Sequence, residues 1–114
     1  MKIEEIRYLL NAKISSLPKC RDCEYNFAFA SDLMSDVLRI RPDEVILITG
    51  LCNVQTIRTA EMSDINCVVL GRGKQPNDEM KKLAQDNNIT LMYCDYSVYK
   101  ICSILGKEGI KPLY

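Results

Sequence analysis

Two turns in the middle of the chain combine glycine with polar or charged side chains. The turn from Thr49 to Asn53 (TGLCN) follows one apolar run, and the turn from Gly71 to Lys74 (GRGK) follows the next. Arginine forms paired hydrogen bonds with phosphate and carboxylate groups, and glycine lets a backbone approach a ligand closely. These residue types are therefore typical of a site for an anionic small molecule, such as a nucleotide or a sugar phosphate.

The expected ligand contacts come from three turns. The first would supply backbone amides and polar side chains, and the second would supply positive charge and a closely approaching backbone. The residues that we predict to bind the ligand are Thr49, Gly50, Asn53, Gly71, Arg72, Gly73, Lys74 and Asp95. Each has an alternative structural interpretation, because glycine turns a chain out of a sheet, asparagine and aspartate cap helices, and loop cations are commonly solvated.

The sequence shows no catalytic constellation. It contains no histidine and no Gly-x-x-x-x-Gly-Lys-Ser/Thr phosphate loop. Asp32 and Asp36 are four residues apart on one face of a predicted helix. Paired carboxylates can hold magnesium or transfer protons, but carboxylates on a helix surface usually do neither. We therefore predict no catalytic residue, metal ligand or cofactor, and we expect that the protein is not an enzyme.

The six cysteines do not form a recognisable metal site. Cys20 and Cys23 have the spacing of half a zinc or iron–sulfur site, but neither a second pair nor a histidine completes it. A redox pair is the alternative interpretation of these two residues. Cys67 lies in an apolar strand and Cys102 on an apolar helix face, where cysteine packs as a small hydrophobic residue. We expect all six thiols to be reduced and free of metal.

The elements that position the turns alternate between strand and helix. Apolar runs predict strands at residues 45–48, 67–70 and 89–93, with a helical segment after each. Strands that alternate with helices form a mostly parallel, buried sheet, and ligands bind beyond the carboxyl ends of its strands. All three turns of the predicted site lie at that edge.

The first forty residues add the other half of the fold. Residues 12–16 and 27–30 are short candidate strands. Before them, a helix buries Ile3, Ile6 and Leu10. After them, Ser31 is expected to cap a helix from Asp32 to Leu38 that Pro42 ends. The residues expected to face inward on this second helix are Leu33, Val37 and Ile40.

Later helix ends have their own signals. Asn53 is expected to cap the helix after it, Pro76 to lie in the first turn of the next helix and Asp95 to cap the last one. Gly109 is expected to end that helix. The inward-facing residues expected on the three helices are Val54, Ile57, Ala60, Met80, Leu83, Ala84, Val98, Ile101, Cys102 and Leu105.

Composition fits one α/β domain over residues 1–114, a three-layer α/β/α structure with a mostly parallel sheet of about four to five strands. Lysine plus arginine equals aspartate plus glutamate, 15 each, which argues against electrostatic binding to nucleic acid or membranes. The amino terminus lacks the apolar core of a signal peptide, and no apolar run approaches the roughly 20 residues that span a bilayer. We therefore expect a soluble cytoplasmic protein.

The segment from Val45 to Gly109 resembles a DRTGG domain, a small α/β module found beside catalytic or CBS domains. The resemblance rests on LITG at 47–50, NVQT at 53–56, VLGRGKQP at 69–76 and DYSV at 95–98, and AFASDLMSDVL at 28–38 is similar to the upstream part of stand-alone members. The family's Thr-Gly-Gly turn falls on Gly71, Arg72 and Gly73, so arginine replaces a glycine. The fold that this implies also resembles the amino-terminal domain of HPr kinase/phosphorylase.

The resemblance implies a non-catalytic regulatory or ligand-binding module that acts through a partner protein. The alternatives are an accessory or assembly subunit without a small-molecule ligand, or a phosphoryl-transfer or thiol-redox enzyme. Tyrosine is enriched at interfaces, and four tyrosines lie toward the end of the chain. They are Tyr93, Tyr96, Tyr99 and Tyr114. We therefore expect a homodimer.

Overall fold

The apolar runs of the sequence form one central sheet. The computed structural model describes residues 1–16, 22–37 and 44–114 of the chain. Within these residues six strands pair in the order β1-β5-β4-β3-β2-β6. Their bounds are β1 Lys13–Ile14, β2 Phe27–Ala30, β3 Val45–Thr49, β4 Cys67–Leu70, β5 Thr90–Tyr93 and β6 Lys111–Pro112. Every neighbouring pair is parallel except β1 with β5, which is antiparallel.

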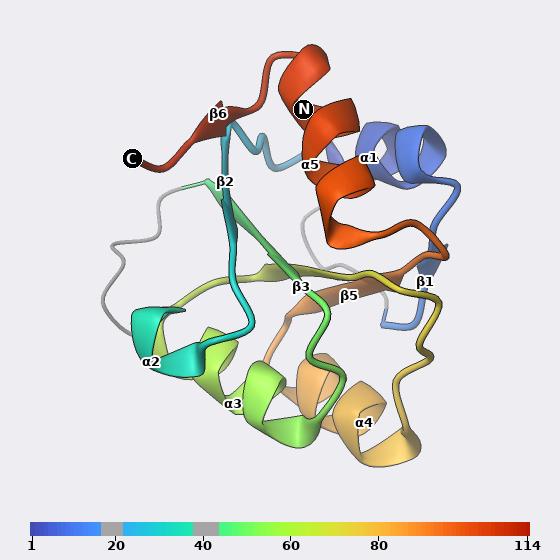
Figure 1. The fold of residues 1–114 in the computed structure, drawn as a ribbon. Coiled ribbons are helices and arrows are strands. Elements are labelled where there is room, and N and C mark those ends of the chain that lie inside the picture. The colour runs from blue at the N-terminus through green and yellow to red at the C-terminus, as the bar shows by residue number, and fades with distance from the viewer. Residues whose placement is uncertain (17–21, 38–43) are drawn as a thin grey trace.

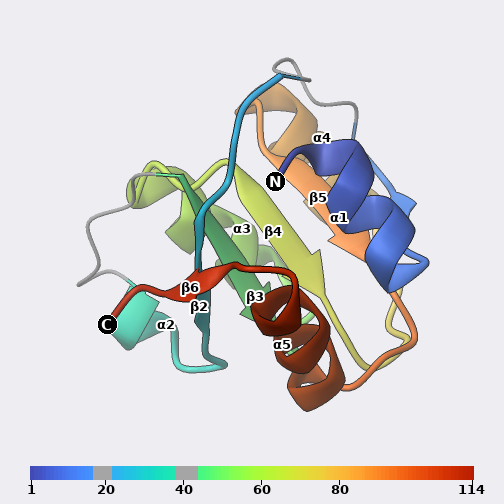
Figure 2. The ribbon, with the colours of Figure 1, turned by 90° about the horizontal axis from the view of Figure 1, so that it is seen from above.

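Helices cover both faces of the sheet (Figure 1). On one face lie α1 (Ile3–Leu10) and α5 (Val98–Lys107), and on the other lie α2 (Met34–Val37), α3 (Val54–Met62) and α4 (Asp78–Asp86). Figure 2 shows α1 and α5 together on the same side of the strands. The expected three-layer α/β/α architecture with a mostly parallel sheet is therefore confirmed.

Side chains on each central strand alternate between two cores. In β3, Ile46 and Ile48 pack with α1 and α5, whereas Leu47 packs with the helices of the opposite layer. All five residues of β3 are buried. A strand that is buried on both faces reads as a continuous apolar run, which is why β3 and β4 were visible in the sequence.

The strand β6 was not expected. After α5, Gly109 adopts a φ of +101° and the N–H of Ile110 donates to the carbonyl of Leu105 at 3.0 Å. This is the hydrogen bond that joins the chain beyond a helix end to its last turn in a Schellman motif. The chain then pairs with β2 at the sheet edge, a position where Pro112 needs no N–H for the ladder. Gly109 ends the helix as predicted. The sequence did not indicate β6, because its two residues, Lys111 and Pro112, show no pattern typical of a strand.

Three expected helix starts can be compared with the structure. Asn53 caps α3, because its Oδ1 accepts a hydrogen bond from the N–H of Thr56 at 3.1 Å. Ser97 rather than Asp95 caps α5, accepting from Lys100 N at 3.1 Å. Asn77 caps α4, so Pro76 lies before the helix instead of in its first turn. Serine and asparagine are as good as aspartate at this position, so sequence alone did not select between neighbours.

Within the described residues, the helix α2 begins at Met34, two residues after the expected start at Asp32. Ser31 does not cap it; its Oγ accepts from the N–H of Leu33 at 3.0 Å in a local turn. Leu33 is 58% exposed and therefore does not face inward, whereas Val37 is buried. Asp32 precedes the helix, so it does not share a helical face with Asp36. The expectations for Ile40 and Pro42 lie outside the described residues.

Among the described residues, four cysteines are free thiols and one is disulfide-bonded. Cys67 is fully buried, and burial raises its pKa to about 12. Cys52, Cys94 and Cys102 are also free thiols. Cys23 is disulfide-bonded, so the expectation of six reduced thiols is wrong at this residue. A disulfide requires two sulfur atoms at bonding geometry, which the spacing of cysteines in a sequence does not establish. Cys20 lies outside the described residues.

None of the helices in the described ranges is long and apolar enough to cross a membrane.

Candidate functional site

The predicted turns meet at the carboxyl edge of the sheet. The register pairs Thr49 of β3 with Leu70 of β4, so the turns that follow these strands are neighbours. The N–H of Gly71 donates to the carbonyl of Thr49 at 3.0 Å, and the N–H of Gly73 donates to the carbonyl of Cys94 at 2.9 Å. The turns after β3, β4 and β5 are therefore joined by backbone hydrogen bonds, as parallel neighbouring strands predict.

A fourth turn, after β2, brings Asp32 to this edge. Oδ1 of Asp32 accepts hydrogen bonds from Thr49 Oγ1 at 2.8 Å and from the N–H of Gly50 at 2.7 Å. These two bonds, the Gly50 amide first, lower the pKa of the Asp32 carboxyl, and the positive charges of Arg72 and Lys74 act in the same direction. Asp32 is thus an ionised carboxylate in the middle of the predicted site.

Sequence reasoning assigned Asp32 to a helix surface and did not include it in the site. The signal that identifies it is its position two residues after the end of β2, at the same edge as the other turns. Using that signal requires knowing that β2 is a neighbour of β3.

Arg72 has an unusual backbone conformation. Its φ is +69°, in the left-handed region that costs most residues about 1–2 kcal/mol. Its N–H donates to the carbonyl of Tyr96 at 2.8 Å, which holds the turn against the start of α5. Within the described part of the chain, the guanidinium group of this exposed side chain forms no hydrogen bond and no ion pair. Arg72 is therefore held in a strained conformation, and none of the described residues pairs with its charge.

The Arg72 side chain lies across Gly50. A Cβ atom added to Gly50 would be 2.8 Å from Arg72 Cδ, 3.4 Å from Arg72 Nη1 and 3.5 Å from Asp32 Oδ2. The guanidinium group and the carboxylate therefore both border the small space above Gly50. A side chain at position 50 would therefore displace that of Arg72.

The other two glycines of the site serve the packing of the turn. A Cβ on Gly71 would be 3.0 Å from both Ile101 Cδ1 and the carbonyl oxygen of Tyr96, so a larger residue would separate the turn from α5. Gly73 adopts a φ of +73°, and a Cβ there would be 3.4 Å from Asp95 Oδ1. Asp95 thus places a second carboxylate beside the turn, and its side chain is exposed.

Lys74 supplies the second positive charge. It is exposed, and its charge lowers the pKa of Asp32. Burial raises the pKa of the Cys52 thiol, while the charge of Lys74 opposes this effect. Lys74 therefore lies close enough to influence both the turn after β2 and the turn after β3.

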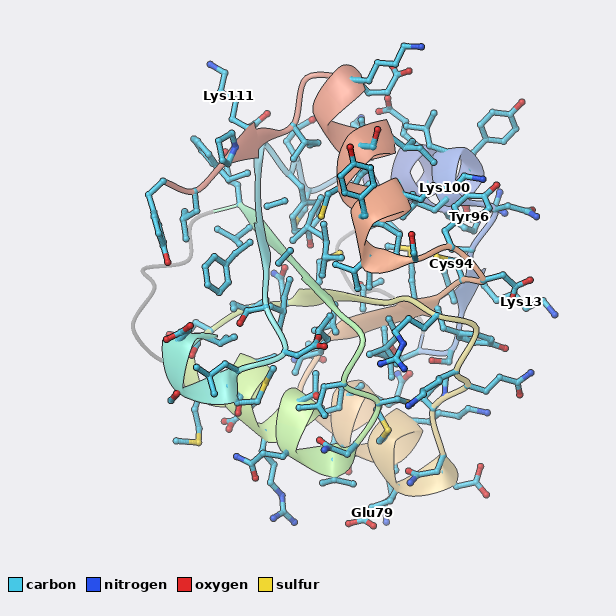
Figure 3. The ribbon with its side chains drawn as sticks, viewed as in Figure 1. Lys13, Glu79, Cys94, Tyr96, Lys100 and Lys111 are labelled. Atoms are coloured by element: carbon cyan, nitrogen blue, oxygen red, sulfur yellow. The ribbon has the colours of Figure 1, made fainter. Side chains whose placement is uncertain are left out.

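Side chains at the start of α5 continue this edge. Lys100 Nζ lies 4.0 Å from the centroid of the Tyr96 ring, a cation–π arrangement. Figure 3 shows Tyr96 and Lys100 beside Cys94, while Glu79 lies far from them on α4.

The backbone amides of the site are largely occupied. The N–H groups of Gly50, Gly71, Arg72 and Gly73 all donate within the chain. The side chain of Asn53 is used as a helix cap, accepting from Thr56. The Gly50 amide that was expected to contact a ligand is therefore already bonded to Asp32, and the amides of the second turn bond to neighbouring turns. Side chains must supply most of the contacts to any ligand.

An apolar cavity lies elsewhere in the molecule. It has a volume of about 260 Å³ and is lined mainly by residues of β2, α5 and β6. Its rim includes Lys111, which Figure 3 shows at the edge of the molecule near β6. Among the described residues, no group of three or more histidine, cysteine, aspartate or glutamate side chains could hold a metal ion.

The architecture matches a regulatory protein of known structure. No protein-family model matches the chain, and no curated protein matches it in sequence. A similar solved structure is that of the CBS and DRTGG domains of the regulatory region of Clostridium perfringens pyrophosphatase, complexed with its activator diadenosine tetraphosphate. The TM-score is 0.80 at 15% sequence identity. The chain has a DRTGG-type fold. The alignment covers 91% of this chain and 45% of the pyrophosphatase chain, so the chain spans less than half of that neighbour.

Proposed function

We propose that the chain is a non-catalytic regulatory module, one DRTGG-like domain over residues 1–114. It binds a nucleotide or another phosphorylated small molecule at the carboxyl edge of its sheet and acts through a partner protein. The observation that carries this proposal is Arg72, a cation held at a φ of +69° over Gly50 with no ion pair to any described residue. Strained backbone conformations of this kind cluster at ligand sites, where the strain positions a functional group.

The charges at the edge suit an anionic group. Arg72 and Lys74 follow β4 within four residues, and both are exposed. A guanidinium group binds phosphate through two parallel hydrogen bonds, while a lysine adds a mobile point charge. The carboxylates of Asp32 and Asp95 offset the two positive charges of this edge. Binding of an anion should therefore require more than attraction to a net positive charge.

The pyrophosphatase neighbour supports a regulatory role. Its solved region is regulatory and contains a nucleotide activator. We carry over only the idea that a fold of this type serves in regulation, because a likeness at 15% identity is one of fold. The bound ligand of this chain is inferred from its own residues.

Thermal-shift screening of nucleotides and phosphorylated metabolites tests the proposal. We expect at least one compound to raise the melting temperature, and its binding to weaken as salt is added. Arg72→Ala should lower the affinity by about 10- to 100-fold, the effect of losing one charge-assisted hydrogen bond. Arg58→Ala is the matched control, because Arg58 is an exposed arginine on α3, away from these turns.

A second variant moves the Arg72 charge without removing it. In Gly50→Ala the new methyl group occupies the position now 2.8 Å from Arg72 Cδ, so the flexible arginine must move. We expect a loss of affinity with little loss of stability. If Arg72→Ala, Gly50→Ala and Lys74→Ala all bind the compound as well as the wild type does, the site lies elsewhere. If no phosphorylated compound shifts melting at millimolar concentration, an assembly role without a small ligand becomes the better explanation.

We also propose that the module is a homodimer. Large exposed side chains support an interface on the outer surface of the α1 and α5 layer, where Tyr8 is 77% exposed and Tyr99 is 83% exposed. Tyr114 is 88% exposed, and its ring lies 5.8 Å from that of Phe29. Tyr93 instead packs against the core of the opposite layer. Tyrosine contributes strongly to interfaces because it buries a large area with little loss of side-chain freedom.

A further inference from the structure

The space between Arg72 and Asp32 has a defined chemistry. A Cβ atom added to Gly50 would lie 3.4 Å from Arg72 Nη1 and 3.5 Å from Asp32 Oδ2. The distance between the Arg72 and Asp32 atoms therefore cannot exceed the sum of these two values. The two groups nevertheless do not form an ion pair. A donor and an acceptor therefore face each other here at a separation that is too long for an ion pair.

The two oxygens of Asp32 have different roles. Oδ1 accepts both internal hydrogen bonds, from Thr49 Oγ1 and the Gly50 amide. Oδ2 accepts no hydrogen bond from a described residue and borders the space above Gly50. The first oxygen fixes the orientation of the carboxylate, and the second is left to face a ligand.

Only some chemical groups satisfy both neighbours. A phosphate oxygen would accept from Arg72 but be repelled by the Asp32 carboxylate. An ammonium group would donate to Asp32 but be repelled by Arg72. A hydroxyl group donates one hydrogen bond and accepts others, so it satisfies both. The lowered pKa of Asp32 keeps it ionised at neutral pH, which leaves it able to accept only.

We propose that a ligand hydroxyl bridges Asp32 Oδ2 and Arg72, so that the site selects sugar-containing phosphates over bare phosphate or pyrophosphate. The phosphate of such a ligand is then placed toward Lys74, the second exposed cation of this edge. Carboxylates at the carboxyl edge of parallel sheets accept hydrogen bonds from ribose in dinucleotide-binding proteins, which shows that the chemistry suits this location. This inference rests on the proposed function and names the ligand class of the same site.

The test is a matched pair of ligands on the whole chain. Calorimetric titration compares AMP with 2′,3′-dideoxy-AMP, and ribose 5-phosphate with tetrahydrofurfuryl phosphate, which keeps the ring and the phosphate but lacks hydroxyl groups. Pyrophosphate is the ligand without a sugar. We expect the hydroxylated member of a pair to bind about 10-fold or more tightly to the wild type, the effect of one hydrogen bond to a charged group.

Asp32→Asn isolates the role of the free oxygen. Asparagine keeps an oxygen for Thr49 and Gly50 but replaces Oδ2 with an amide NH₂ that cannot accept. We expect the preference for hydroxylated ligands to fall to within about threefold and pyrophosphate to bind more tightly, because a repelling charge is gone. Asp36→Asn is the matched control on α2 and should keep the wild-type preference.

The outcomes separate this inference from the proposed function. If phosphorylated ligands bind but the wild type does not distinguish the members of either pair, the bridging hydroxyl is wrong and the phosphate site stands. The same conclusion follows if Asp32→Asn keeps the full preference. If none of the phosphates binds the wild type at millimolar concentration, both proposals are wrong. The ligand pairs on the wild-type protein decide the matter even if Asp32→Asn does not fold.

Discussion

At the scale of single residues, Arg72 and Asp32 define the site in different ways. Arg72 stays in a left-handed conformation that glycine would adopt more easily. Asp32 uses one oxygen to hold the turn after β3 and leaves the other uncommitted. Both residues therefore combine a structural task with an available polar group, and substitutions can separate the two.

The backbone strain at Arg72 can be measured apart from its charge. Arg72→Gly and Arg72→Ala both remove the guanidinium group, but only glycine relieves the positive φ. We expect Arg72→Gly to be more stable than Arg72→Ala by about 0.5–1 kcal/mol, after allowing for the greater flexibility of unfolded glycine. Urea unfolding of the two variants measures this difference. Equal stabilities would show that the turn relaxes at no cost and that Arg72 is not strained.

The carboxylate of Asp32 should make stability depend on pH. Its pKa is lowered in the folded protein, chiefly by the Gly50 amide and the Thr49 hydroxyl. The contribution is therefore fully present above the unfolded pKa of about 3.9 and is lost as the pH falls through the folded value. Because Asp32 is exposed and its charge is screened by water, we expect a difference of only about 1 kcal/mol between the wild type and Asp32→Asn at pH 7.

Unfolding curves between pH 7 and pH 2 check this expectation. The stability difference between the wild type and Asp32→Asn should be constant near neutral pH and disappear in acid. Asp36→Asn provides the comparison, since Asp36 accepts no hydrogen bond from a described residue. A difference that persists unchanged to pH 2 would contradict the assigned role of Asp32.

At the scale of elements, the end of α5 decides where the sixth strand begins. The N–H of Gly109 donates to the carbonyl of Gly106 at 3.2 Å, and the chain turns back through Ile110 to pair with β2. The two glycines are three residues apart but have different tasks, because only Gly109 has a positive φ.

The same substitution at these two glycines should have opposite effects. A Cβ on either residue would meet nothing within 4 Å, so steric contacts do not distinguish them. Gly106→Ala adds a better helix former within α5 and should stabilise the fold by about 0.5–1 kcal/mol. Gly109→Ala forces a side chain into the left-handed region and should destabilise it by about 1–2 kcal/mol. Thermal unfolding of the pair provides the comparison, and shifts of the same sign would show that Gly109 does not set the turn.

At the scale of the whole molecule, the exposed tyrosines on α1 and α5 lead to a prediction about assembly. Sedimentation of the wild type at micromolar concentration should show a species of about twice the 13.0 kDa chain mass. Tyr99→Ser should shift the equilibrium toward monomer, because interface tyrosines are frequent energetic hot spots. Met62→Ser, which changes an exposed residue on the opposite helical layer, is the control. A single 13.0 kDa species in the wild type would exclude the homodimer.

The sequence alone determined the order of the elements up to α5 and most of the core. Apolar runs located β3, β4 and β5, and the spacing of Ile3, Ile6 and Leu10 located the buried face of α1. These signals are local, because strand burial and helix periodicity depend on neighbouring residues. The short connections of a parallel sheet then brought the turns after β3 and β4 together.

Only the tertiary structure decided how the site is built. Asp32 reaches Thr49 and Gly50 across 17 and 18 positions of sequence, a contact that exists because β2 lies beside β3. The same packing occupies the amide of Gly50 and lays Arg72 over it. Hydrogen bonds between distant turns depend on which strands are neighbours and on the direction in which the backbone leaves the sheet after each strand. A local pattern of residues determines neither of these.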